Sequence, residues 1–107
     1  MGKIITYKNQ GGGVFSQIQF DSGERVLVSI STPKMTVKIF KLLWGKIPTS
    51  TIFTMSLDQA TNIFLKKEAW GKQGIILDKI VGTIKDSESI SNMKDKLNQL
   101  VASKQTI

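Results

Sequence analysis

Hydrophobic and polar residues alternate in the first half of the chain with the two-residue period of half-buried β-strands. The alternation is clearest at residues 14–20 and 25–31, where apolar residues recur at almost every second position and Gln or Ser stands at several of the positions between them. Residues 21–24 separate the two runs, and their Asp and Gly are typical of a tight turn with a positive φ at the glycine. Two such runs around a short turn predict a β-hairpin.

Three further segments have strand-like patterns, and turn-forming stretches separate them. The Gly-rich residues 9–13, the segment around Pro33 and residues 45–48 are the expected breaks. Because connections this short join antiparallel neighbours, we expect a meander, either an open sheet or a small closed barrel. The predicted strands cover residues 3–8, 14–20, 25–31, 35–44 and 49–55.

The period changes near Met55 and Ser56, and the rest of the chain has helical spacing. Ser56 and Gln59 have the separation of a capping box, in which each side chain bonds a backbone N–H of the other residue. A last helix is predicted to begin within residues 86–89. Its apolar stripe would consist of Ile90, Met93, Leu97, Leu100 and Val101.

The pattern leaves the type of one element open, at residues 74–84. Its isoleucines and leucine fit a second, shorter helix, but the stretch is β-branched and ends near Gly82, which also suits a strand. Either way the predicted class is α+β: an antiparallel sheet or small barrel of about five strands in residues 3–55, then two or three helices in residues 56–103. No repeat or linker interrupts the chain, so we expect residues 1–107 to form a single domain, frayed from about residue 103.

Composition excludes several classes of chemistry. The chain has no cysteine and no histidine, so disulfides, thiolate chemistry, Cys/His zinc sites and imidazole mechanisms are impossible within it. The acidic pairs Asp21/Glu24 and Asp86/Glu88 are explained by a turn and by a helix start. Glycines 11–13 lead into a strand, whereas a phosphate-binding loop leads into a helix. We therefore expect a non-catalytic protein with no catalytic residue, no metal site and no cofactor.

Location is predicted from the absence of targeting features. No apolar run reaches the roughly 18 residues that a membrane span requires, and the N-terminus lacks the hydrophobic core of a signal peptide. A small secreted domain would often carry disulfides, which this chain cannot form. A cytoplasmic protein without a membrane span is expected.

Charge suggests the kind of partner. The net charge is +7, and residues 1–55 hold seven basic residues against two acidic ones, whereas residues 56–107 hold eight against six. A basic surface attracts polyanions, such as nucleic acid, an anionic membrane or an acidic protein partner. The plainer alternative is that the lysines serve solubility alone.

One strand carries the candidate site. Alternation puts Lys38, Phe40, Leu42, Trp44 and Lys46 on one face of residues 35–46. Proteins that bind single-stranded nucleic acid combine cations, which hold phosphates, with aromatic rings, which stack on bases. Uncharged Gln17, Gln19, Ser29 and Ser31 on neighbouring strands would extend such a face. The predicted nucleic-acid-binding residues are Arg25, Lys38, Phe40, Trp44 and Lys46.

Two alternatives stay open. Phe40, Leu42 and Trp44 are equally explained as core residues if the helices cover that face of the sheet. A helical apolar stripe can also be buried against a second copy, which would make the chain a protein-interaction or structural domain, such as a homodimer. The exposure of Phe40 and Trp44 distinguishes a binding face from a core.

Overall fold

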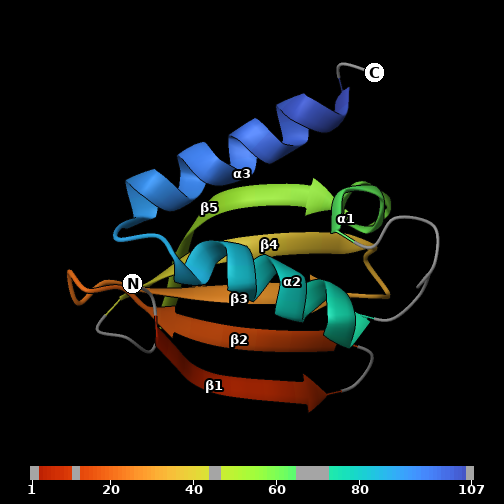
Figure 1. Ribbon diagram of the computed structural model, residues 1–107. Coiled ribbons are helices and arrows are strands. Elements are labelled where there is room, and N and C mark those ends of the chain that lie inside the picture. Colours follow the sequence, from red (N-terminus) through yellow and green to blue (C-terminus); the bar gives the residue numbers. More distant parts are fainter. Residues whose placement is uncertain (1–2, 11–12, 44–46, 65–72, 106–107) are drawn as a thin grey trace.

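The computed structural model describes residues 3–10, 13–43, 47–64 and 73–105 (Figure 1). It confirms the predicted α+β fold, with five antiparallel strands followed by three helices. The strands are β1 (Lys3–Gln10), β2 (Gly13–Gln19), β3 (Arg25–Ser31), β4 (Thr36–Leu43) and β5 (Ile47–Ser56). The helices are α1 (Leu57–Phe64), α2 (Gln73–Lys85) and α3 (Ile90–Gln105).

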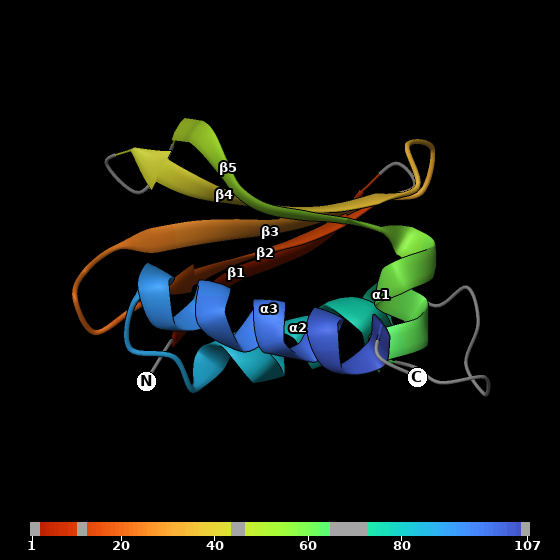
Figure 2. The ribbon, with the colours of Figure 1, turned by 90° about the horizontal axis from the view of Figure 1, so that it is seen from above.

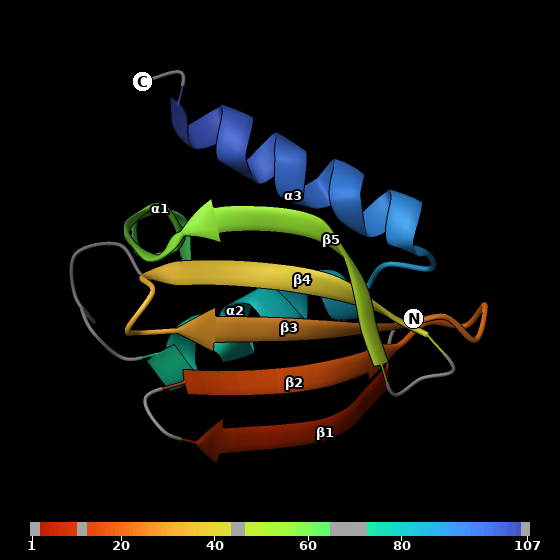
Figure 3. The ribbon, with the colours of Figure 1, turned by 180° about the vertical axis from the view of Figure 1, so that it is seen from behind.

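The sheet is a meander whose strand order is the order of the sequence, β1-β2-β3-β4-β5. Each described strand pairs antiparallel with its sequence neighbours. β1 and β5 are the two ends of this order, so the described sheet is open rather than closed into a barrel. The second half of β5 lies at the edge opposite β1, whereas its first half curves across β4 and β3 in Figure 3.

All three helices lie on one side of the sheet, as Figure 2 shows. The hydrophobic core fills the space between the two layers, and it includes Met93 and Leu97 of the predicted α3 stripe, which are 0% and 1% exposed. In β2 and β3 and the first half of β4, buried residues alternate with half-buried ones. The strand residues of the core cluster are Val14, Ile18, Val26, Val28, Ile30, Val37, Ile39 and Met55.

Residues 74–84, whose type the sequence left open, belong to helix α2. Ile76, Leu77, Ile80 and Ile84 have the spacing of one helical face and are each at most 1% exposed. α2 contacts β1, β2 and β3, so this face covers the half of the sheet that includes the β1 edge. Burial against the sheet explains why a β-branched segment is helical here, since tertiary packing outweighs local propensity.

Hydrogen bonds at the turn and at two helix starts agree with the sequence pattern. The backbone N–H of Phe20 donates to the carbonyl of Glu24 at 2.8 Å, and Gly23 has a φ of +91° in this turn. The N–H of Gln59 donates to Ser56 Oγ at 3.0 Å, which is one half of the predicted capping box. Ser89 caps α3 in the same manner, accepting from the N–H of Asn92 at 3.2 Å.

Several strand boundaries differ from the predicted ones. β1 extends to Gln10, into the expected Gly-rich break, and β2 covers Gly13–Gln19 rather than residues 14–20. β4 begins at Thr36 rather than at residue 35, because Met35 has a left-handed backbone with a φ of 51°. β5 begins at Ile47 and includes Pro48, which we expected in the turn. An edge strand accepts a proline because one side of its hydrogen-bonding ladder is unpaired.

The turn between β3 and β4 is tied to the start of α1. The N–H of Met35 donates to the carbonyl of Thr32 at 3.1 Å, which closes the turn. The carbonyl of Met35 accepts from the N–H of Leu57 at 2.9 Å, and Leu57 is the first residue of α1. This bond satisfies a backbone donor that a helix start leaves without an intrahelical partner.

Candidate nucleic-acid interface

One face of the sheet points away from the helices (Figure 2). The end of β4 and the first half of β5 bend onto this face where β2 ends and β3 begins, and no described element lies in front of its other end (Figure 3). We call this surface the open face. Opposed residues of antiparallel strands share a face, so the pairing defines rows across it. Its central residues on β2, β3 and β4 are Phe15, Gln17, Gln19, Arg25, Leu27, Ser29, Ser31, Thr36, Lys38 and Phe40.

Lys38 and Phe40 lie on the open face. Both are half-buried, whereas their neighbours Val37 and Ile39 are 0% exposed and belong to the core cluster. The strand thus divides its side chains, with the aliphatic residues toward the helices and the cation and aromatic ring away from them. Phe40 is therefore not part of the described core between the sheet and the helices, as the alternative interpretation had it.

Leu42 follows Phe40 in the same alternation but is only 5% exposed. It is nevertheless outside the core cluster of the described residues. Figure 2 shows the end of β4 and the start of β5 bending away from the helix layer, toward the side of the open face. The pairing of β5 with β4 is irregular at two places in this stretch, after Ile39 and after Lys41, and irregular pairing bends a strand.

The other predicted site residues have different outcomes. Arg25 is half-buried at the start of β3, opposite Gln19 and in the alternation of the open face. It is four residues from Ser29 along β3, so it lies at the far end of the face from the row that contains Lys38. Trp44 and Lys46 lie outside the described residues. Of the predicted residues that are described, Lys38 and Phe40 lie near each other on β4, and Arg25 shares their face at its opposite end.

Two adjoining hollows lie at the other end of the open face, with volumes of about 280 and 250 Å³. They share Ser29 and Ser31 of β3. The first hollow is lined by Ser29, Ser31, Lys34, Thr36, Lys38 and Phe40. The second is lined by Gly13, Val14, Phe15, Ser29, Ile30, Ser31 and Pro33.

Lys34 and Phe15 are among the residues of this surface that were not predicted. Lys34 is exposed and lines the first hollow, but its position in the turn around Pro33 hid its relation to the strand face. Phe15 alternates with Gln17 and Gln19, and this alternation was the signal that could have placed its ring on the open face. The pairing of Phe15 with Ser29 brings it beside the hollows.

Charge is distributed unevenly between the two layers. Among the described side chains, the sheet and its turns carry five basic residues against two acidic ones, and the helices with their connection carry four against five. The basic residues of the sheet layer are Lys3, Arg25, Lys34, Lys38 and Lys41. Lys41 Nζ lies 3.8 Å from Glu24 Oε2, an exposed ion pair of the kind that contributes little stability.

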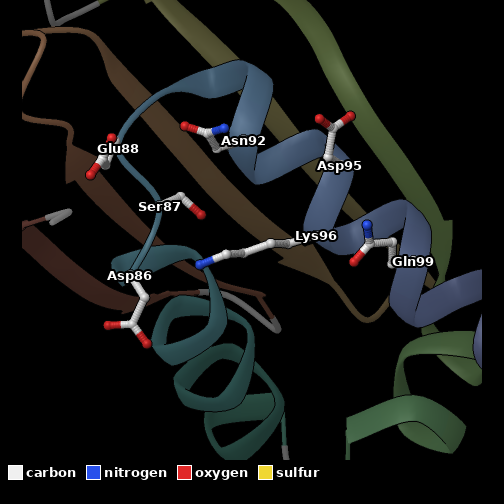
Figure 4. Close-up of a pocket in the computed structure, with 7 residues that line it drawn as sticks. All are labelled: Asp86, Ser87, Glu88, Asn92, Asp95, Lys96 and Gln99. Carbon is white, nitrogen blue, oxygen red and sulfur yellow. The ribbon is translucent and has the colours of Figure 1, made fainter.

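A third hollow, of about 320 Å³, lies between α3 and the connection that precedes it (Figure 4). It is lined by Asp86, Ser87, Glu88, Asn92, Asp95, Lys96 and Gln99. Figure 4 shows the carboxylates of Asp86, Glu88 and Asp95 pointing to different sides rather than toward a common point. In the described part of the chain, no group of three or more His, Cys, Asp or Glu side chains is placed to hold a metal ion. Acidic residues that are spread apart in this way do not form a carboxylate pair of the type that acid–base hydrolysis requires.

No described helix is both long and apolar enough to cross a membrane. No protein-family model matches the chain, and the comparisons with curated proteins and with solved structures likewise give no match.

Proposed function

We propose that this protein is a non-catalytic module that binds single-stranded nucleic acid on the open face of its sheet. The observation that carries the proposal is the position of Lys38 and Phe40, a cation and an aromatic ring that share an uncovered strand face. Ammonium groups neutralise phosphates, and an aromatic ring stacks on a base of any sequence.

The surroundings of these two residues support the same function. Lys34 adds a second cation at the first hollow, and the remaining polar lining consists of Ser and Thr hydroxyls. Hydroxyl groups can form hydrogen bonds with bases, sugars or phosphates, and they do not repel an anion. Among the described residues, no carboxylate lines either of the two hollows on this face, although Glu24 and Asp21 lie in the turn at its other end.

Single strands suit this surface better than a duplex does. In a duplex the bases are stacked inside and paired, so a ring on a protein surface cannot stack on their faces. In a single strand the bases can turn outward onto a sheet while the backbone follows the lysines. Binding is therefore expected to tolerate changes of sequence and to prefer single strands over duplexes of equal length.

The direct test measures binding of a labelled oligothymidine by fluorescence anisotropy at low ionic strength. Phe40→Ala is expected to weaken binding about 5- to 150-fold, because this is the range that the loss of one base–aromatic stack produces. Lys38→Glu is expected to weaken it at least as strongly, because it replaces a phosphate contact with a repulsion.

Lys94→Glu is the matched control, since Lys94 is exposed on α3 and lies in the helix layer. It makes the same change of net charge and is expected to leave binding within about twofold of the unmodified protein. No binding of single strands at low ionic strength, or equal losses for Lys38→Glu and Lys94→Glu, would contradict the proposal.

A protein-interaction domain that dimerises through the α3 stripe is the competing proposal. It has less support, because Met93 and Leu97 are already buried in the core of the same chain. Leu100 and Val101 are half-buried, so the stripe offers little apolar surface to a second copy.

A further inference from the structure

We infer that the open face holds two bases of one strand at the same time, with Phe15 as a second stacking residue beside Phe40. This inference rests on the proposed function and specifies its ligand as an extended single strand with at least two unstacked nucleotides. The strand would cross β2, β3 and β4 diagonally, passing between Ser29 and Leu27 of β3, with Lys38 beside it on β4.

The first support is the environment of Phe15. Its ring is half-buried on the open face, whereas the neighbouring Val14 and Ser16 are 4% and 1% exposed on the helix side of β2. Phe15 is outside the core cluster of the described residues. A large aromatic ring on an uncovered face is not needed for core packing, and it offers a flat apolar surface to a ligand.

The second support is the spacing of the two rings. Phe15 pairs with Ser29, which pairs in turn with Lys38, so these three residues form one row across the sheet. Phe40 lies two residues beyond Lys38 on β4 and pairs with Leu27. From strand spacing and rise per residue, the Cα atoms of Phe15 and Phe40 are about 12 Å apart.

This separation decides between a stacked and an extended ligand. Stacked bases follow one another at about 3.4 Å along a strand, so two neighbouring stacked bases cannot reach both rings. A strand that contacts both rings must have its bases separated, as in complexes with single-strand-binding proteins. The protein residues between the two rings then face the sugar–phosphate backbone of the ligand rather than a base.

The third support is the chemistry between the rings. The two hollows meet at Ser29 and Ser31, and Phe15 lines one hollow while Phe40 lines the other. Lys34 and Lys38 both line the hollow of Phe40. A phosphate between the two bases would therefore lie closer to Phe40, with the serine hydroxyls as uncharged donors beside it.

The test compares variants of Phe15 with an oligothymidine of about ten nucleotides, long enough for the site sizes of single-strand binders. Phe15→Ala is expected to weaken binding by at least fivefold, and Phe15→Tyr, which keeps the ring, is expected to restore most of it. Gln99→Ala is the control, since Gln99 is exposed on α3 in the helix layer, and its expected change in binding is below twofold. Thermal unfolding of each variant shows whether the fold is kept.

Ligand length gives a second readout, by the backbone amide signals of the ¹⁵N-labelled protein. We expect thymidine monophosphate to shift signals near one ring only, and longer oligomers to shift those of both Phe15 and Phe40. If Phe40→Ala weakens binding while Phe15→Ala does not, the second stacking residue is refuted and the proposed function stands. If no oligomer binds at low ionic strength, both are refuted.

Discussion

At the scale of single residues, Met35 is the described non-glycine residue with a positive φ, and its strain is local. Its φ of 51° brings its Cβ close to the backbone, a conformation that costs a non-glycine residue about 1–2 kcal/mol. The side chain is 46% exposed, so little packing compensates for this cost. Two backbone hydrogen bonds stabilise this conformation of Met35, one within the turn and one to Leu57.

Replacing Met35 by glycine is expected to raise the free energy of unfolding by about 0.5–1 kcal/mol. Removal of the Cβ relieves the strain, and the greater freedom of glycine in the unfolded chain offsets part of the gain. Denaturant unfolding measures the change. Met35→Ala is the control, because it shortens the exposed side chain but keeps the Cβ; equal stability of the two variants would rule out backbone strain as the cause.

At the scale of elements, the hairpin of β2 and β3 was predictable because its turn and its alternation agree. The type of residues 74–84 was not, since Ile76, Leu77, Ile80 and Ile84 fit both periods until the sheet provides a surface to cover. The face of the sheet on which Phe40 lies was not predictable either. β4 has apolar residues in both registers, and only the side on which the helices pack distinguishes the core face from the open one.

The α3 stripe gives a prediction at this scale. Leu97→Ala is expected to lower the free energy of unfolding by about 2–5 kcal/mol, because it leaves a cavity in the core of the same chain. The exposed Gln99 on the same helix is the control, and Gln99→Ala should change stability by no more than about 0.5 kcal/mol.

Sedimentation velocity distinguishes this structural role from dimerisation. Leu97→Ala is expected to leave the sedimentation coefficient of the folded protein unchanged. A dimer of the unmodified protein that becomes a stable monomer on Leu97→Ala, with unaltered unfolding, would instead identify the stripe as an interface.

At the scale of the whole molecule, the two layers differ in charge as well as in structure. The described sheet layer has an excess of basic side chains and the helix layer is close to neutral. The proposed polyanionic ligand would therefore be attracted to one side of the molecule. This asymmetry could be estimated from the sequence, because the excess of lysine lies in the first 55 residues. That Lys34 lies beside Lys38 at the first hollow could not be estimated, since Lys34 belongs to a turn and its direction depends on the backbone there.

Salt dependence tests whether this asymmetry is used in binding. For a single strand, each phosphate contact contributes about −0.7 to the slope of log affinity against log salt concentration. The double variant Lys34→Gln/Lys38→Gln is therefore expected to make the slope shallower by about 1.4 if both lysines contact phosphates. Lys79→Gln/Lys94→Gln, which removes two exposed charges from the helix layer, is the matched control. Equal slopes for the two double variants would mean that binding follows net charge alone.

The irregular edges of the sheet have a consequence for association between copies of the chain. β5 contains Pro48 and two interruptions of its pairing, and β1 is interrupted between Ile4 and Thr6. A continuous intermolecular sheet needs a long, regular row of free backbone donors and acceptors, and proline and bulges remove that regularity. Both edges are thus expected to be poor templates for strand addition between copies of the chain.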